Sequence, residues 1–267
     1  MNSATYIHKC GVCMASNVTS TPLLNKYELE MLLHSIYLGD FSTLHLPTSL
    51  YLKTAKQLED YLLIGFGEVK NDMQQVKFNK MRRNIYYFAA AKTYAMVNEV
   101  EQTKENKPYD KFKLDTVNIV TDFLGAYLAV EKDHTKMCGK AGKKWSQAES
   151  KKTAPYLEYV TMKDNRVRPA HVYLDGIIKK SDDNFWNTFM PPNGWSCRCK
   201  VKSYKDGDET NLKDFNKDEA LQNVPVMFRT NFGKDGIIFP HDHPYFKNAD
   251  KVLAKNNFNL PLPHTNK

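Results

Sequence analysis

The sequence predicts an α+β protein in which a helical N-terminal half precedes a compact mixed α/β C-terminal module. Before residue 150, apolar residues recur every three or four positions, which is the period of one helix face. Beyond residue 150, short runs of strand-forming residues alternate with prolines and glycines. We therefore predict a flexible N-terminal segment at 1–20, a helical domain at 21–150 and an α+β module at 151–267.

Three apolar stripes predict the main helices of the first half. They are Tyr51, Ala55, Leu58 and Leu62; Phe78, Met81, Ile85 and Phe88; and Val117, Val120, Leu124 and Leu128. We expect the first helix to begin after Pro47 and to end at Gly65 and Gly67. We expect the second helix to end before Pro108. Such stripes are far more often part of a core than of a cofactor site, so we interpret them as packing surfaces.

Strands are predicted in the second half of the chain. Residues 156–161 are rich in strand formers, and residues 175–178 have the pattern of a turn that leads into a short strand. Residues 198–204 alternate polar and apolar side chains, which is the period of a half-buried strand. Together with the prolines and glycines between them, these segments define the predicted α+β module.

Composition and cysteine usage exclude several classes of protein. A hydrophobic share of 42% argues against wholesale disorder. The sequence holds no apolar run of about eighteen residues, so we expect no membrane association. The N-terminus lacks the features of a secretory signal, and we expect synthesis in the cytoplasm, with departure only inside a larger particle. The odd count of five cysteines favours free thiols or metal ligands over a secreted disulfide framework.

The net charge of +8 suits an acidic partner such as DNA. Residues 131–152 concentrate this excess, with seven lysines and three acidic residues around two glycines. A solvated linker is the commoner outcome for such a composition, and an arm that faces DNA phosphates is the alternative. The candidate DNA-facing residues are Lys136, Lys140, Lys143, Lys144, Lys151 and Lys152.

Residues 164–199 collect an unusual density of functional groups between proline and glycine turns. The members are Arg166, Arg168, His171, Asp175, Gly176, Asp182, Asp183, Pro191, Pro192, Trp195, Cys197, Arg198 and Cys199. Side chains two apart on an extended segment point to the same side, so Cys197 and Cys199 are able to reach one ion. His171 is the candidate third ligand, and this donor set suits tetrahedral zinc. Candidates for the fourth ligand are Asp175, His241 and His243.

Two other interpretations of these residues stay open. In the first, the thiols pack beneath aromatic side chains and His171 is hydrogen-bonded to the backbone. In the second, a cysteine acts as a nucleophile with His171 as its base, or His171 and Asp175 form an acid–base pair. The sequence contains no acyl-transfer, P-loop or HExxH signature, which argues against an enzyme. Cys10 and Cys13 form a further Cys-x-x-Cys pair, interpreted as two tolerated surface thiols.

The same segment resembles the C-terminal signature of the phage Mu F-like minor head protein family, also called phage head morphogenesis proteins. That signature has arginines before a His, an apolar residue followed by Gly, an Asp-containing segment, a proline-rich turn and a final Cys-Arg-Cys. Residues 166–199 contain these parts in the same order. Residues 194–196, Gly-Trp-Ser, stand where many members carry a His or another small polar residue.

The resemblance implies a minor head protein of a tailed phage or prophage, located in the virion at the head interior or the portal vertex. The expected partners are portal and capsid proteins, and packaged DNA through non-specific phosphate contacts. The implied roles are head morphogenesis, portal association or DNA ejection. Two alternatives are a phage-encoded effector, either a nuclease or a transferase carried on a head module, and a zinc-binding DNA-associated module.

Overall fold

The computed structural model describes residues 23–222 and 224–264. Contacts within the chain define two compact units that interleave along the sequence. Of the described residues, unit 1 comprises 23–59, 82–132 and 241–264, and unit 2 comprises 60–81 and 133–240, without residue 223. The predicted fold class is confirmed, because the first half is helical and the second half contains a small antiparallel sheet. The predicted domain boundaries at 20 and 150 stay predictions.

Three helices contribute residues to both units: α3 (Thr48–Phe66), α4 (Asp72–Gln102) and α6 (Leu128–Glu149). The three apolar stripes lie in helices, as expected from their period. The basic residues 131–149 are part of α6, so the interpretation of this stretch as a linker is wrong. Within the described residues, no helix is both long and apolar enough to cross a membrane.

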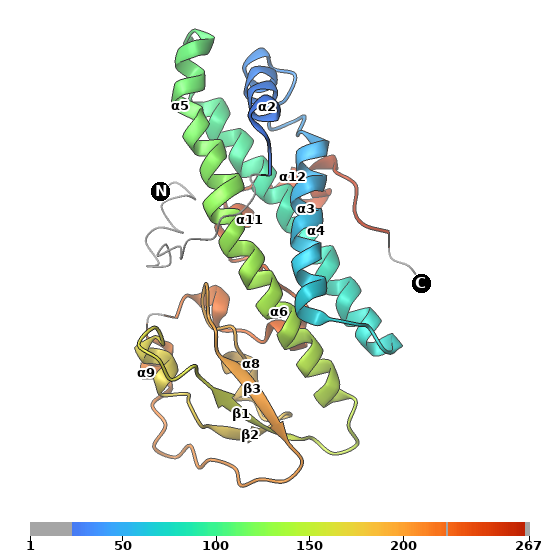
Figure 1. The fold of residues 1–267 in the computed structure, drawn as a ribbon, viewed down its shortest axis with the longest axis vertical. Helices are drawn as coiled ribbons and strands as arrows, with labels where there is room; N and C mark the ends of the chain where they lie inside the picture. Colours follow the sequence, from blue (N-terminus) through green and yellow to red (C-terminus); the bar gives the residue numbers. More distant parts are fainter. Residues whose placement is uncertain (1–22, 223, 265–267) are drawn as a thin grey trace. The chain divides into compact units, whose positions relative to one another are not determined.

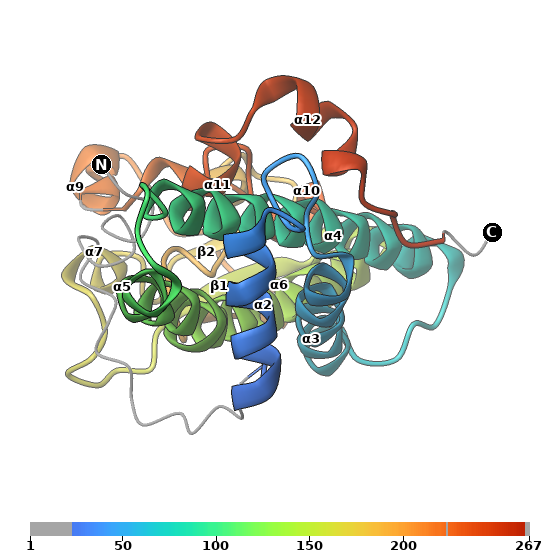
Figure 2. The same cartoon turned by 90° about the horizontal axis from the view of Figure 1, so that it is seen from above.

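Unit 1 is built from helices and short helical turns. Its elements are α2 (Lys26–Leu38), the parts of α3, α4 and α6 given above, α5 (Tyr109–Asp122), the π-helix η1 (Phe123–Tyr127), α11 (Pro244–Lys247), α12 (Lys251–Lys255) and the 3₁₀-helix η3 (Asn257–Asn259). Asn25 begins α2 with a capping box, in which its side chain and that of Glu28 each accept the other's backbone N–H at 2.9 Å. Helix α2 lies beside α5 and α3 (Figure 2).

A buried ion pair lies in the core of unit 1. The Nζ atom of Lys92 on α4 is 2.8 Å from the Oε1 atom of Glu131 on α6, and both side chains are at most 2% exposed. The Lys92 ammonium also lies over the rings of Phe123 and Tyr245, at 5.4 and 5.3 Å from their centroids. Burial lowers the pKa of Lys92 and raises the pKa of Glu131, while the contact between the two charges opposes both shifts.

Unit 2 contains a three-stranded antiparallel sheet with the order β2-β1-β3 (Figure 1). The strands are β1 (Tyr156–Val160), β2 (Ile178–Lys180) and β3 (Lys200–Tyr204), close to the predicted segments. In register, Tyr156 pairs with Lys180 of β2 and with Tyr204 of β3. Short helices connect and follow the strands: α7 (Pro169–Val172), α8 (Trp186–Phe189), α9 (Lys217–Leu221), the 3₁₀-helix η2 (Val226–Phe228) and α10 (Phe232–Asp235).

Glycines allow α3 and α6 to approach closely within unit 2. A Cβ atom on Gly65 would lie 2.1 Å from the backbone oxygen of Lys136, and one on Gly139 would lie 2.9 Å from the backbone oxygen of Leu62. Gly65 is therefore a packing residue inside α3, and the prediction that it stops the helix is wrong. Gly67, with φ +69°, follows the last helical residue and is the left-handed position that ends α3.

Candidate metal centre

His171, Cys197 and Cys199 come together in unit 2 from two separate segments. His171 lies in α7, whose first residue is Pro169, and the two cysteines immediately precede β3. The backbone N–H of Cys197 donates to the carbonyl of Gly194 at 3.2 Å, which closes a tight turn before the strand. His171 and Cys197 are each 2% exposed and Cys199 is 4% exposed. The cluster therefore belongs to the core of unit 2.

The potential ligand atoms of these three residues face one another. The Nδ1 atom of His171 is 3.8 Å from the Sγ atom of Cys197 and 3.6 Å from the Sγ atom of Cys199. All three ligand atoms lie within 4.8 Å of one another. The structure therefore brings together the three residues that the sequence proposed as zinc ligands.

A backbone carbonyl fixes the orientation of the His171 ring. The Nε2 atom of His171 is 3.3 Å from the carbonyl oxygen of Asn193. A carbonyl only accepts hydrogen bonds, so Nε2 carries the proton and Nδ1 presents its lone pair to the sulfur atoms. A metal-binding histidine usually donates its other ring N–H to a carbonyl or carboxylate in this way, which fixes the orientation of the ring.

The two thiols differ in acidity because they share a hydrogen bond. That bond, together with the contact to His171, holds the pKa of Cys197 well below its ordinary value. The same bond and burial raise the pKa of Cys199. A lowered pKa favours the thiolate, the form of cysteine that binds metals.

Asn193 organises the turn beside the site, and sequence reasoning did not single it out. Its side-chain nitrogen donates to the carbonyls of Thr188 and Phe228, at 3.3 and 3.4 Å. Its side-chain oxygen accepts from the hydroxyl of Tyr159 at 3.1 Å. Pro191 and Pro192, joined by a cis peptide bond, are buried just before it. The segment 191–193 is therefore tied to β1, α8 and η2.

The arginines of the motif lie around the site and are held by specific partners. Arg198 forms two hydrogen bonds of 2.7 Å with Asp164, and this interaction lowers the pKa of Asp164 to about 2. Arg168 donates to the carbonyl of Trp195 at 2.6 Å, and Gly194 leaves room for its guanidinium group. Arg166 is exposed, and its backbone N–H donates to Asp164 at 3.1 Å.

The acidic residues of the motif shape loops and do not join the three candidate ligands. Asp175 accepts hydrogen bonds from the backbone and the hydroxyl of Thr161, at 2.7 and 2.9 Å, and lies outside the group of three ligand atoms. Gly176 follows with φ +81°, a left-handed conformation that a glycine adopts without strain. Asp183 accepts from the backbone N–H of Phe185 at 2.7 Å, and Asp182 is exposed.

The other candidate ligands have separate locations. His243 is buried in unit 1, where its ring accepts from the backbone N–H of Tyr245 at 3.2 Å and packs against Phe88. His241 is also in unit 1 and packs against Phe246. Their role as metal ligands stays a prediction. The Cys10 and Cys13 pair lies outside the described residues.

A second Cys–His pair in unit 2 escaped sequence reasoning. The Nε2 atom of His134 lies 2.9 Å from the carbonyl oxygen of Ile238 and 3.4 Å from the Sγ atom of Cys138. Trp195 and Phe228 are among the rings that surround it, with centroids 5.1 and 5.4 Å away. Burial lowers the pKa of His134 to about 4. His134 and Cys138 are four residues apart and so lie on one helix face, a spacing from which their contact could have been predicted.

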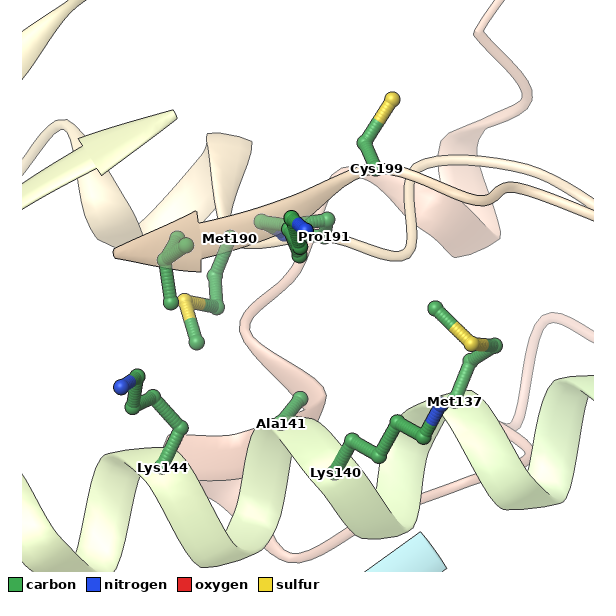
Figure 3. A pocket seen from close by; sticks show the side chains of 9 residues that line it. Met137, Lys140, Ala141, Lys144, Met190, Pro191 and Cys199 are labelled. Atoms are coloured by element: carbon green, nitrogen blue, oxygen red, sulfur yellow. The ribbon is translucent and has the colours of Figure 1, made fainter. Parts of the chain in front are cut away.

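The basic face of α6 borders a cavity of about 140 Å³. Lys140 and Lys144 of α6 and Lys200 of β3 line this cavity, together with apolar side chains. Figure 3 shows Lys144 extending from α6 toward Met190 on the facing segment. None of the three lysines forms an ion pair with another residue in the described part of the chain.

The remaining candidate DNA-facing lysines have different surroundings. Lys143 donates to the side chain of Gln74 at 2.7 Å and to the backbone of Glu68, so its charge is used within unit 2. Lys136 is half-buried on α6. Lys151 and Lys152 are exposed just beyond the end of this helix. Of the six candidate lysines, Lys140 and Lys144 line the cavity, and Lys200, which the sequence did not suggest, lines it as well.

Residues 124–202 match the sequence model of a family described as phage Mu protein F like protein. The matched region runs from η1 to β3 and contains His171, Cys197 and Cys199. The resemblance inferred from the motif is therefore confirmed, and this region of the chain is similar to the phage Mu F-like family.

Three curated proteins share shorter segments with this chain. Protein F of Escherichia phage Mu, whose name assigns it provisionally to capsid assembly, is 49% identical over 49 residues. The Mu-like prophage FluMu F protein of Haemophilus influenzae is 42% identical over 60 residues, and an uncharacterised protein of Methanocaldococcus jannaschii is 44% identical over 48. These segments cover 18%, 22% and 18% of this chain, and 11%, 14% and 8% of the three relatives. No solved structure matches the chain.

Proposed function

We propose that this protein is a structural component of the head of a Mu-like tailed phage or prophage and acts in head assembly. The observation that carries the proposal is the family match over residues 124–202, which contains both α6 and the segment that bears the three candidate ligands. The name of the phage Mu relative, which refers to capsid assembly, supports the same role. The proposed location is the virion, and the proposed partners are the portal and capsid proteins.

The chemistry of the site favours a structural role over nucleophilic catalysis. A nucleophile has to reach its substrate, whereas Cys197 and Cys199 are at most 4% exposed and pack in a core with Leu157 and Trp186. Two arginines beside them are held within the chain, Arg198 by Asp164 and Arg168 by the carbonyl of Trp195. Such a set fixes the shape of a small module, which is what an assembly protein needs.

The lysine-lined cavity gives the proposed head protein a place to contact packaged DNA. Lys140, Lys144 and Lys200 bring three positive charges to one cavity without an ion pair from the described residues. Phosphate neutralisation requires only such charges and no base-specific contact. We therefore include non-specific DNA contact in the proposed function, and the cavity as its site.

Sedimentation of phage lysates tests the proposed location. The lysate of a host that produces the phage is separated on a density gradient, and the protein is detected by mass spectrometry in the fractions with heads. We expect the protein to sediment with heads and to remain there after tails are removed. A protein that stays with the soluble fraction of every lysate would contradict the proposal.

A nuclease assay tests the alternative that the protein is an effector. An effector nuclease degrades plasmid DNA in the presence of Mg²⁺, and the His171→Ala variant loses this activity. We expect the purified protein to leave plasmid DNA intact under these conditions. Degradation that disappears in the variant would replace the structural proposal with an enzymatic one.

A further inference from the structure

We propose that His171, Cys197 and Cys199 bind one zinc ion whose fourth coordination position opens into a small arginine-lined cavity and takes water or a small anion. The proposal does not depend on the role in head assembly, because it rests on the geometry of unit 2 alone. It has two parts, the ion and the open position, and each part has its own test.

The distances from the His171 nitrogen to the two sulfur atoms match edges of a zinc tetrahedron. Zinc lies about 2.3 Å from a thiolate sulfur and 2.0–2.1 Å from an imidazole nitrogen, so a tetrahedral angle places nitrogen and sulfur about 3.6 Å apart. The observed separations of His171 Nδ1 from the two sulfur atoms are 3.6 and 3.8 Å. The nitrogen atom is therefore spaced from both sulfur atoms as one shared ion requires, and all three ligand atoms lie within 4.8 Å of one another. Two sulfurs and one nitrogen favour zinc over oxygen-seeking ions such as Mg²⁺.

The described residues supply three ligands and leave the fourth position free. No other His, Cys, Asp or Glu of the described chain joins this group. Asp175 binds Thr161 and Asp164 binds Arg198, and Asp133 of α6, whose carboxylate interacts electrostatically with Cys197, does not join the group of ligand atoms either. Structural zinc sites have four protein ligands, whereas sites with three keep a position for water or another small ligand.

A cavity of about 20 Å³ lies next to the three ligands and fits this open position. His171, Cys197 and Cys199 line it, and so do Arg166, Arg168 and Arg198. Its rim includes the exposed Met162 and Ser196, so it opens to solvent. The volume suffices for about one water molecule and excludes a large substrate.

The charges around the cavity favour an anion at the open position. Two thiolates neutralise the two positive charges of zinc, and the side chains of the three arginines add positive charge to the wall. Asp164 offsets the charge of Arg198 through their paired hydrogen bonds. The three arginines outnumber this one carboxylate, with which Arg166 also interacts, so the wall keeps a net positive charge that attracts an anion to the open position.

Metal content of the full chain tests the first part. The Cys10→Ser/Cys13→Ser variant serves as the parent protein, so that the N-terminal pair contributes no metal. We expect this parent to bind one equivalent of zinc, and the further changes Cys197→Ser and Cys199→Ser to abolish binding. The matched control is Cys138→Ser, which removes a buried thiol that also contacts a histidine and should keep the full equivalent. A zinc-free parent, or full binding without Cys197 and Cys199, would overturn the zinc site.

Cobalt substitution tests the second part on the parent protein, so that no ligand variant has to fold. Co²⁺ in the site should give thiolate charge-transfer absorption in the near ultraviolet and d–d bands of a tetrahedral ion. Azide or thiocyanate should shift the d–d bands in a saturable manner by occupying the open position, with no loss of bound metal. Bands that stay unchanged at saturating azide and thiocyanate would show a closed site and overturn the open position.

Discussion

At the scale of single residues, the site owes its shape to side chains that bond to distant parts of the chain. Asn193 bonds to Tyr159 and Phe228, which lie 34 and 35 residues away in the sequence. An Asn after two prolines is also typical of an exposed turn, so sequence patterns did not distinguish this role. His171, Cys197 and Cys199 were predictable because their chemistry is specific, whereas the residues that position them are defined by tertiary contacts.

His134 predicts a loss of stability in mild acid. Burial lowers the pKa of the His134 side chain to about 4, whereas a histidine in an unfolded chain has a pKa of about 6.5. The unfolded state therefore binds more protons between these values, and the stabilisation is complete above pH 6.5 and is lost as the pH falls through 4. We expect His134 to contribute a decrease of about 3 kcal/mol in the free energy of unfolding between pH 7 and pH 4.

Urea unfolding of the wild type and His134→Gln at pH 7, 5.5 and 4.5 measures this contribution. The variant should be less stable at pH 7, because it loses the ring contacts with Trp195 and Phe228, and should depend less on pH. Other titrating groups affect both proteins alike, so the difference between them isolates His134. Parallel pH profiles for the two proteins would contradict the assignment.

At the scale of elements, α6 is the helix whose extent the sequence described least well. Its buried residues Cys138, Ala141, Trp145 and Ala148 follow the helical spacing, but lysines and two glycines separate them. Glycines usually weaken a helix, so this composition indicated a linker. In the structure Gly139 allows α3 to approach, and close packing compensates for the weak propensity.

The close approach of α3 and α6 predicts opposite effects for two Gly→Ala changes. Gly65→Ala places a methyl group against the backbone of Lys136, and we expect a loss of roughly 1–3 kcal/mol or more. Gly125→Ala is the matched control, since it also lies in a helix but would meet no atom within 4 Å. This change should stabilise the protein by roughly 0.5–1 kcal/mol. Thermal denaturation compares the two, and equal effects would refute the packing argument.

The ion pair between Lys92 and Glu131 predicts strong coupling between α4 and α6 in unit 1. Lys92→Met leaves a buried carboxyl group without its positive partner, and we expect a loss of about 3–5 kcal/mol. The double variant Lys92→Met/Glu131→Leu removes both charges and should recover most of this loss. Urea unfolding of the two single variants and the double variant gives the coupling energy. Additive losses would show that the pair is not coupled.

At the scale of the whole molecule, periodicity predicted the helical first half and the three strands of the sheet. The grouping of residues into compact units was beyond sequence patterns, because residues 60–81 belong with 133–240 through tertiary contacts alone. The candidate metal centre was partly predictable. The spacing of the two cysteines on an extended segment indicated that their side chains point to the same side. That no fourth ligand of the described residues joins them is visible only in the fold.

The lysine-lined cavity makes a prediction about how salt affects DNA binding by the full protein. Replacing Lys140, Lys144 and Lys200 with Gln should weaken binding to duplex DNA of any sequence. The slope of log K against log salt should fall by about 2.7 if each lysine neutralises one phosphate. A filter-binding titration at several salt concentrations measures this slope.

A control with the same change of charge separates the cavity from the net charge. Lys205, Lys213 and Lys217 are exposed in unit 2 and do not line the cavity. Their replacement with Gln should leave the slope nearly unchanged. If both triple variants lower the slope equally, DNA binding reflects the overall charge of +8 and not the cavity.

The role in head assembly is tested most directly by inactivating the gene in its phage or prophage. Electron microscopy of the lysate counts DNA-filled heads, and a plaque assay gives the titre of infectious particles. We expect tails without DNA-filled heads, a large loss of titre, and recovery of both when the wild-type gene is supplied from a plasmid. Normal numbers of filled heads with an unchanged titre would contradict the proposed function.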